Sequence, residues 1–96
     1  MTPKERNLAD IGLIALRHGL TRHDILGWSR KDHIVKARQH CFRHFRQKTV
    51  NGRIMSYPEI GRLFGRHHST VIYGVSQYVD RNAPLSPLSG YSAGLI

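Results

Sequence analysis

The apolar residues of this chain recur at intervals of three and four positions, which is the spacing of helices with one buried face. A first helix is predicted from about residue 3, because residues 2–5 (Thr-Pro-Lys-Glu) read as a capping box with proline at the first helical position. Residues 21–24 (Thr-Arg-His-Asp) repeat the start signal and open a short helix that ends near Gly27. A third capping box, residues 56–59 (Ser-Tyr-Pro-Glu), opens a helix of about two turns.

Two further helices are predicted, one from about Asp32 to about Lys48 and one from about His67 to about Arg81. The polar faces of the first of these carry Lys36, Arg38, Arg43 and Arg46. The apolar faces of all five helices together carry Leu8, Ile11, Gly12, Ile14, Ala15, Ile25, Leu26, Ile34, Val35, Ala37, Cys41, Phe42, Phe45, Ile60, Leu63, Phe64, Val71, Ile72, Val75, Tyr78 and Val79. Between the helices, Asn51-Gly52 is a strong turn signal. We expect an irregular loop around it, with a small hairpin as the alternative.

The last two predicted helices, separated by Gly65, have the proportions of a helix-turn-helix. The second of them opens with a polar tip, and its apolar residues follow only afterwards; the tip consists of Arg66, His67, His68, Ser69 and Thr70. Such a helix can bury its body and present its N-terminus to a ligand. We therefore predict an all-α fold, a compact bundle of about five helices containing a helix-turn-helix over residues 1–81. The Pro-, Gly- and Ser-containing segment 82–96 is predicted to be a flexible tail.

The charge balance indicates the partner of this tip. Fifteen Lys and Arg face six Asp and Glu, for a net charge of +9, and such a field attracts phosphate backbones. A membrane partner is disfavoured because no segment approaches the roughly 18 continuous apolar residues of a membrane span. The polar N-terminus is unlike a signal peptide, and a single cysteine fits a reducing compartment. A cytoplasmic, nucleoid-associated protein is expected.

Seven histidines and one cysteine raise the alternative of a metal site. His40 and His44 form an i, i+4 pair that could bind zinc, and His67-His68 could complete the ligands. Cys41, however, lies on the apolar face, where core packing is the better account. No metal or other cofactor is therefore expected. Six acidic residues leave little material for a metal-dependent nuclease, so the protein is not expected to be an enzyme. A basic module that binds an acidic protein partner stays open as the alternative to DNA binding.

The segment Phe64-Gly65-Arg66-His67-His68-Ser69-Thr70-Val71, preceded by Pro58-Glu59-Ile60-Gly61, resembles the signature of one known domain. This is domain IV, the C-terminal DNA-binding domain, of the bacterial replication initiator DnaA. Residues 20–26, Arg30 and residues 36–39 extend the resemblance, which covers roughly residues 7–80. It implies sequence-preferring binding of double-stranded DNA, in replication-initiation control or in transcriptional regulation.

The resemblance also implies roles for single residues. The positions that match base contacts are Arg30 in the minor groove and His67, His68, Ser69 and Thr70 in the major groove. The positions expected to hold phosphates are Arg38, Gln39, Arg46, Pro58 and Arg66. The family usually carries an aspartate where this chain has His67, which predicts a different base preference there.

The full initiator also contains an ATP-binding module with a G-x-x-x-x-G-K-[ST] loop, and nothing in this sequence matches that loop. No nucleotide is therefore expected as a partner. The chain reads as a DNA-binding fragment or as a free-standing small protein. Its single asymmetric motif makes a monomer on one DNA site the default.

Overall fold

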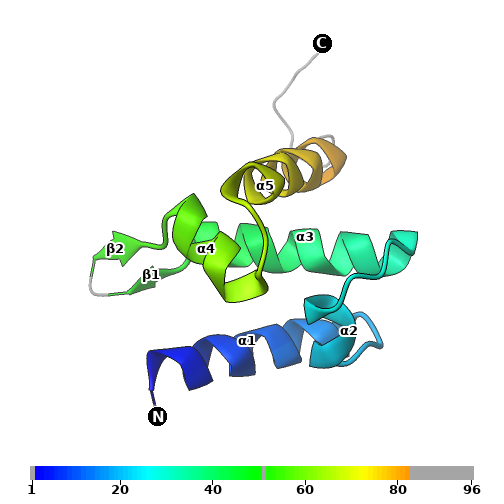
Figure 1. The fold of residues 1–96 in the computed structure, drawn as a ribbon, viewed down its shortest axis with the longest axis horizontal. Helices are drawn as coiled ribbons and strands as arrows, with labels where there is room; N and C mark the ends of the chain where they lie inside the picture. The colour runs from blue at the N-terminus through cyan, green and yellow to red at the C-terminus, as the bar shows by residue number, and fades with distance from the viewer. Residues whose placement is uncertain (1, 51, 83–96) are drawn as a thin grey trace.

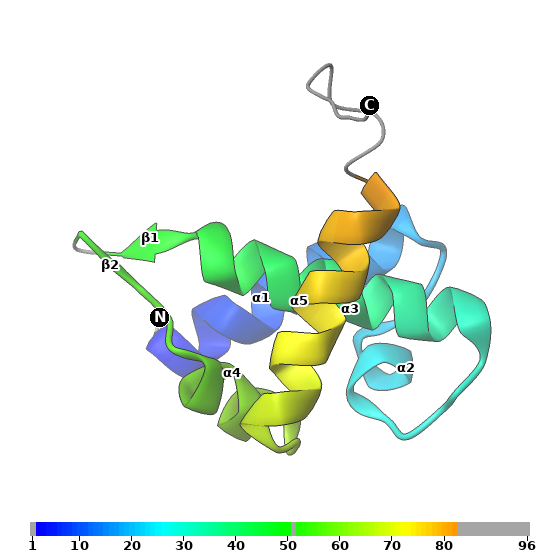
Figure 2. The same ribbon diagram turned by 90° about the horizontal axis from the view of Figure 1, so that it is seen from above.

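The computed structural model describes residues 2–50 and 52–82 and confirms the all-α fold. The helices in this part of the chain are α1 (Pro3–Arg17), α2 (Arg22–Leu26), α3 (Asp32–Gln47), α4 (Tyr57–Phe64) and α5 (His68–Asn82). Figures 1 and 2 show α3 in the middle of the molecule, with α1 and α2 on one side and α5 crossing the other. Helix α4 packs against α5. Among the described residues, no helix is long and apolar enough to cross a membrane.

Three of the helices begin at the predicted capping boxes. The hydroxyls of Thr2, Thr21 and Ser56 each accept a hydrogen bond from the backbone N–H three residues further on. The acidic side chain at that position accepts in turn from the backbone N–H of the cap. Each box satisfies backbone donors that would otherwise be left unpaired at a helix start. Local chemistry therefore sets where α1, α2 and α4 begin.

The core lies around α3. Its buried residues come from every helix and are Ile11, Ile14, Ala15, Ile25, Ala37, Cys41, Phe42, Phe45, Ile60, Phe64, Val71 and Val75. The ring of Phe64 lies edge-on to that of Phe42, with centroids 4.9 Å apart. Helix α5 approaches α3 closely at Gly74, where an added Cβ would lie 2.6 Å from Cδ2 of Phe42. Glycine at this position is therefore what lets the two helices touch.

Cys41 is fully buried in this core, and burial raises the pKa of its thiol to about 12. A thiol held neutral in an apolar setting packs as a small hydrophobic side chain and is a poor metal ligand. Within residues 2–50 and 52–82, no group of three or more His, Cys, Asp or Glu side chains is arranged to hold a metal ion.

The segment between α3 and α4 forms the small hairpin, so the irregular loop expected from the sequence was wrong. Strands β1 (Thr49–Val50) and β2 (Arg53–Ile54) pair antiparallel, with Thr49 opposite Ile54. Gly52 supplies the positive φ, +75°, that a tight reversal of the chain needs. The β-branched residues on both sides of the turn favour extended backbone, which is why the hairpin forms.

Two residues expected on the buried face of α5 are exposed instead. Ile72 and Val79 keep 42% and 37% of their surface in solvent. Ile72 follows the buried Val71 directly, and one helical residue turns by about 100°, so its side chain points away from α3. Val79 lies one turn beyond Val75, toward the C-terminal end of α5. At the end of α5 the structure assigns Asn82 to the helix, and the rest of the predicted tail, residues 83–96, lies outside the described residues.

Candidate nucleic-acid interface

The turn between α4 and α5 is tight and depends on two glycines. Gly65 ends α4 in the left-handed conformation, with φ 68° and ψ 34°. The N–H of Arg66 then donates to the carbonyl oxygen of Gly61 at 2.8 Å. An added Cβ on Gly61 would lie 2.5 Å from the carbonyl oxygen of Arg66, so a side chain has no room there. These contacts give the short helix-turn-helix geometry and direct the start of α5 into solvent.

All of the tip from His67 to Thr70 is exposed. The backbone N–H of Ser69 donates to Nδ1 of His67 at 3.2 Å, and Oγ of Ser69 lies 2.8 Å from the same nitrogen. His67 therefore caps the start of α5 through its ring, as an aspartate in this position could do through its carboxylate. In a neutral imidazole whose Nδ1 accepts, Nε2 carries the proton, so the tip presents an N–H donor at this point.

Arg38 does not lie on a polar face of α3, which corrects its expected placement. Its side chain is 7% exposed. Nε donates to the carbonyl oxygen of Ile25 at 2.7 Å, and Nη1 donates to that of Ser29 at 3.1 Å. Nη2 donates to the carbonyl oxygen of Gly27 at 3.0 Å. Burial lowers the pKa of this guanidinium, and the hydrogen bonds to α2 and to the segment that follows it replace the water it has lost.

Arg66 joins the helix-turn-helix turn to the same connecting segment. Nη1 donates to the carbonyl oxygen of Phe64 at 2.7 Å, and Nη2 donates to that of Gly27. The guanidinium lies over the ring of Trp28, 4.5 Å from its centroid. Burial, and then the positive charge of Arg38, lower the pKa of Arg66 to about 10, so it is still charged at neutral pH. Because Arg66 holds both segments, the tip of α5 has a fixed position relative to residues 27–31.

These contacts bring Arg30 and the tip of α5 to the same hollow, although they lie far apart in the sequence. The hollow has a volume of about 330 Å³ and is lined by Trp28, Ser29, Arg30, Arg38, Gly65, Arg66, His67 and Thr70. In Figures 1 and 2 the turn between α4 and α5 lies beside α2 and the connecting segment. From the sequence, only the family resemblance pairs Arg30 with this tip. Trp28 and Ser29 are additional residues of the hollow, and their one signal in the sequence is an aromatic residue within a basic connector.

The other expected phosphate contacts lie outside the hollow. Arg46 is half-buried at the end of α3, where Nη1 donates to the carbonyl oxygen of Met55 at 2.8 Å and the guanidinium covers the ring of Tyr57 at 4.1 Å. Pro58 is exposed in the first turn of α4. Gln39 is only 9% exposed and faces α5 near Gly74, which leaves it little surface for a direct phosphate contact.

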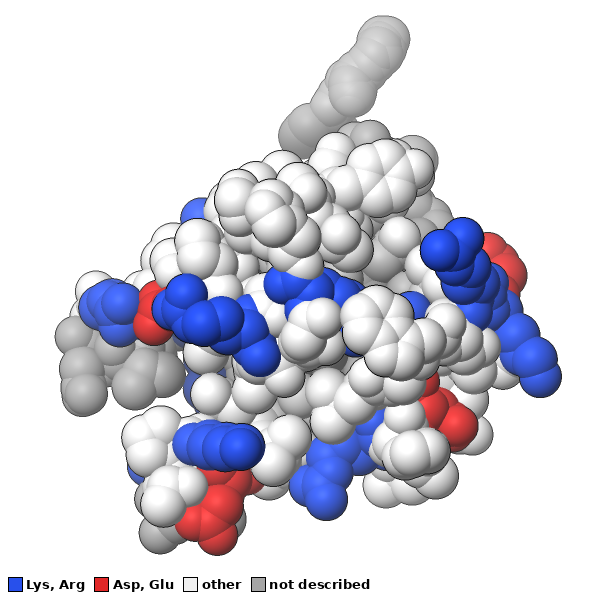
Figure 3. All heavy atoms as spheres, viewed as in Figure 1, with Lys and Arg blue, Asp and Glu red and all other residues white. Residues whose placement is uncertain are grey.

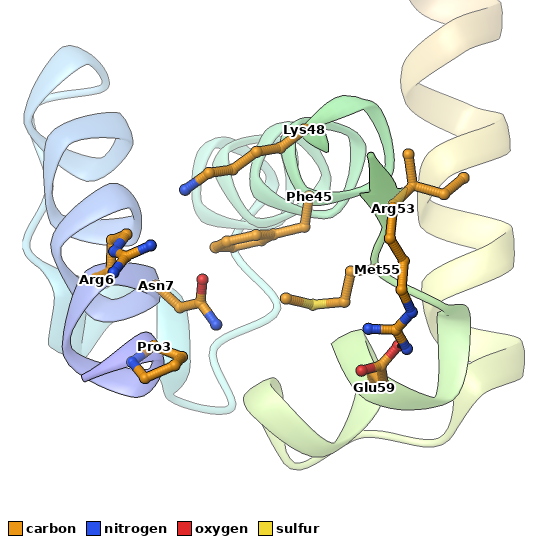
Figure 4. Close-up of a pocket in the computed structure, with 9 residues that line it drawn as sticks. Pro3, Arg6, Asn7, Phe45, Lys48, Arg53, Met55 and Glu59 are labelled. Carbon is orange, nitrogen blue, oxygen red and sulfur yellow. Dashed lines mark hydrogen bonds and ion pairs between the residues drawn. The ribbon is translucent and has the colours of Figure 1, made fainter. Parts of the chain in front are cut away.

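A second hollow of about 470 Å³ lies between α1, the end of α3, the hairpin and α4 (Figure 4). Phe45 and Met55 form an apolar part of its lining, and Arg6, Lys48 and Arg53 surround it. Two of these cations already have partners, because Lys48 pairs with Asp10 and Arg53 pairs with Glu59 at 3.0 Å. In Figure 3, Lys and Arg side chains are spread over the face in view, with fewer Asp and Glu among them.

Most of the chain is similar to one family of known proteins. The family model described as "Bacterial dnaA protein helix-turn-helix" matches residues 11–77. The chromosomal replication initiator protein DnaA of Leptospira biflexa is 33% identical over 73 residues, which cover 74% of this chain and 15% of that protein. The DnaA proteins of Rhodopseudomonas palustris strain BisA53 and of Borrelia duttonii are 36% and 38% identical, covering 88% of this chain. The chain spans less than a fifth of the length of these relatives. No solved structure gives a significant match.

Proposed function

We propose that this chain, which belongs to the bacterial DnaA helix-turn-helix family, binds double-stranded DNA and prefers particular sequences. The observation that carries the proposal is the hollow shared by Arg30 and the tip of α5. A recognition helix enters the major groove by its N-terminus, and an arginine beside it can reach the adjacent minor groove. One rigid surface could therefore contact both grooves of a duplex.

Within this proposal the tip reads base edges. His68, Ser69 and Thr70 are exposed at the start of α5 and offer hydrogen-bonding groups and a methyl group. His67 offers its Nε2–H, because its Nδ1 is occupied by the N–H of Ser69. An aspartate would accept from cytosine N4 or adenine N6, whereas an N–H suits the acceptors of guanine, adenine N7 or thymine O4. The base preferred opposite His67 is thus expected to differ from that of relatives with an acid there.

Phosphate contacts fix the docking. Arg46, Pro58 and Arg66 are accessible enough to serve, and the charge of +9 supports attraction to the duplex as a whole. Arg38 acts instead as a positioning residue, since its hydrogen bonds hold the segment that carries Arg30. Gln39 is the least accessible of the remaining set.

The biological output follows from binding and not from catalysis. The protein would act on the bacterial nucleoid as a monomer, without a metal or nucleotide, in the control of replication initiation or of transcription. Binding of an acidic protein is the second candidate. The hollow in Figure 4 favours it, because an apolar lining beside Arg6, which has no ion pair among the described residues, fits an acidic segment with one apolar side chain.

Selection of bound duplexes from a random pool tests the proposal. An enriched motif with an A·T-rich stretch on one side would support reading by the tip together with Arg30. Duplex binding without any enrichment would overturn the sequence preference. An acidic peptide that binds without competing against DNA would point to the second hollow.

A further inference from the structure

Trp28, the single tryptophan of the chain, is unusually accessible, with 75% of its surface in solvent. Tryptophan carries a large apolar ring system and is normally well buried. The guanidinium of Arg66 holds the indole in place from one side, yet the ring is left mostly in water. Its Nε1–H has no hydrogen-bond partner among the described residues. A fixed and exposed indole of this kind is typical of a binding surface.

The position of Trp28 indicates which part of a bound duplex it would contact. It lines the hollow between Arg30 on one side and the tip of α5, with His67 and Thr70, on the other. If the tip occupies the major groove and Arg30 the adjacent minor groove, the DNA strand that separates the two grooves must pass over this hollow. What passes there is a sugar–phosphate backbone, whichever bases the site contains.

The hollow matches such a backbone chemically. Neither Arg38 nor Arg66 forms an ion pair with a carboxylate among the described residues. Their two positive charges converge on the carbonyl oxygen of Gly27, and the charge of Arg38 is, after burial, part of why the pKa of Arg66 is lowered. A phosphodiester would relieve this repulsion, and Ser29 and Thr70 line the same hollow. The C–H face of the neighbouring deoxyribose is apolar and suits an indole.

We propose that Trp28 is a DNA-backbone contact, in which the indole packs on a deoxyribose of the strand crossing the hollow while Arg66 receives the adjacent phosphodiester. This inference rests on the proposed duplex binding and on both grooves being engaged. A sugar contact carries no sequence information and no charge. Trp28 therefore adds affinity equally to preferred and unrelated sequences, and it contributes nothing to the dependence of binding on salt.

The only tryptophan is also a built-in probe, so the wild-type protein can be tested directly. Acrylamide quenching of its fluorescence is measured with and without a saturating fluorescein-labelled duplex, whose anisotropy reports binding independently. We expect the duplex to protect Trp28, lowering the quenching constant at least about twofold, with emission shifted to the blue. Bound duplex with unchanged quenching would overturn the inference and leave the proposed function standing. If the anisotropy does not rise, the duplex is not bound, and both the inference and the proposed function are wrong.

Substitutions separate a sugar contact from the other roles that an aromatic residue could play. Trp28→Ala should lose affinity on the order of tenfold on the selected duplex and on a scrambled duplex alike, with an unchanged salt slope. Trp28→Phe, the matched variant, should recover most of that loss. A changed ratio between the two duplexes would show a base contact instead. An affinity loss in Trp28→Ala that appears on single-stranded DNA but not on duplex would show base stacking. A base contact or base stacking would each overturn the inference. Thermal unfolding of each variant checks that the fold is retained.

Discussion

Arg38 and Arg66 donate hydrogen bonds to the same acceptor, the carbonyl oxygen of Gly27. One guanidinium reaches it from the middle of α3 and the other from the turn before α5. Because both bonds end on one peptide group, the segment that carries Arg30 is tied at once to the core helix and to the helix-turn-helix. The relative position of the two expected groove contacts thus depends on side chains that are themselves partly or wholly buried.

Removing the Arg38 hydrogen bonds should lower both the stability of the fold and the affinity for DNA. Arg38→Ala leaves the carbonyl oxygens of Ile25 and Ser29 without their donor, which should cost about 2–3 kcal/mol of unfolding free energy. Affinity for the selected duplex should fall because Arg30 is no longer held, and discrimination of A·T pairs in the minor groove should fall with it. Urea unfolding and duplex titrations measure both effects. Arg43→Ala, a change of the same kind on the same helix, is the control, and equal losses for the two variants would refute the positioning role.

Variants of a residue that contacts bases and of one that contacts phosphates should differ in their duplex titrations. His68→Ala should reduce the ratio of affinities for preferred and scrambled duplexes, because its ring lies exposed at the tip. Arg46→Ala should weaken every duplex alike and make the slope of log K against log salt shallower by about one. If both variants scale affinity equally on all sequences, direct reading by the tip is wrong.

The close approach of α5 to α3 gives a prediction about stability alone. Gly74→Ala adds a Cβ that would lie 2.6 Å from Phe42, and the resulting strain should cost about 1–3 kcal/mol of unfolding free energy. Gly12→Ala is the matched control, since nothing lies within 4 Å of its added Cβ. That change should stabilise α1 by up to about 1 kcal/mol through helix propensity. Chemical denaturation of both variants measures the contrast, and the same sign for both would contradict the packing account.

Acid should destabilise the fold through His40. This ring is partly buried between His18, which follows α1, and Tyr78 of α5. Its Nδ1 lies 2.9 Å from Nε2 of His18, and the ring stacks on that of Tyr78. Burial, and then the charges of His18, His44 and Arg17, lower the pKa of His40. The unfolded chain therefore binds a proton at a pH where the folded chain does not, so stability falls as pH drops below about 6.5.

Unfolding free energies measured between pH 7.5 and pH 5 check this expectation. His40→Gln should flatten the profile in that window, because it removes the group that the folded state keeps neutral. His33→Gln, an exposed change on the same helix, should leave the profile in place. A profile for His40→Gln with the same slope as that of the wild type would contradict the prediction, because the other histidines, including His44 beside Asp10, are present in both proteins.

Features of the fold that depend on residues close together in the sequence could be predicted, whereas those that depend on contacts between distant segments could not. The capping boxes at Thr2, Thr21 and Ser56 act within four residues, and they were all foreseen. The burial of Arg38 was not, because its acceptors are carbonyl oxygens of α2 and of the following connector, whose positions relative to α3 are set by tertiary packing. The exposure of Trp28 was missed for the same reason, since an aromatic side chain carries no local signal of which way it faces.

In the candidate site, too, features set by neighbouring residues could be predicted and features set by tertiary contacts could not. Its polar tip could be read from residue types alone, whereas the hollow that joins it to Arg30 needs the hydrogen bonds of Arg66 across the fold. The cap made by His67 lies between these cases. The sequence predicts a helix start at about His67, but the choice of Nδ1 as the acceptor, and hence of Nε2–H as the remaining donor, needs the geometry.

His67→Asp tests that geometry, because it exchanges the outward donor for an acceptor without removing the cap. Aspartate is a favoured N-cap residue, so the variant should be at least as stable as the wild type. Selection from the same random pool should then yield a site that differs mainly at one base pair, with cytosine or adenine presenting its amino group to the carboxylate. His67→Ala is the companion variant: it should lose about 1 kcal/mol of stability and select no particular base at that position. An identical selected site for the wild type and His67→Asp would show that the residue caps α5 and does not contact a base.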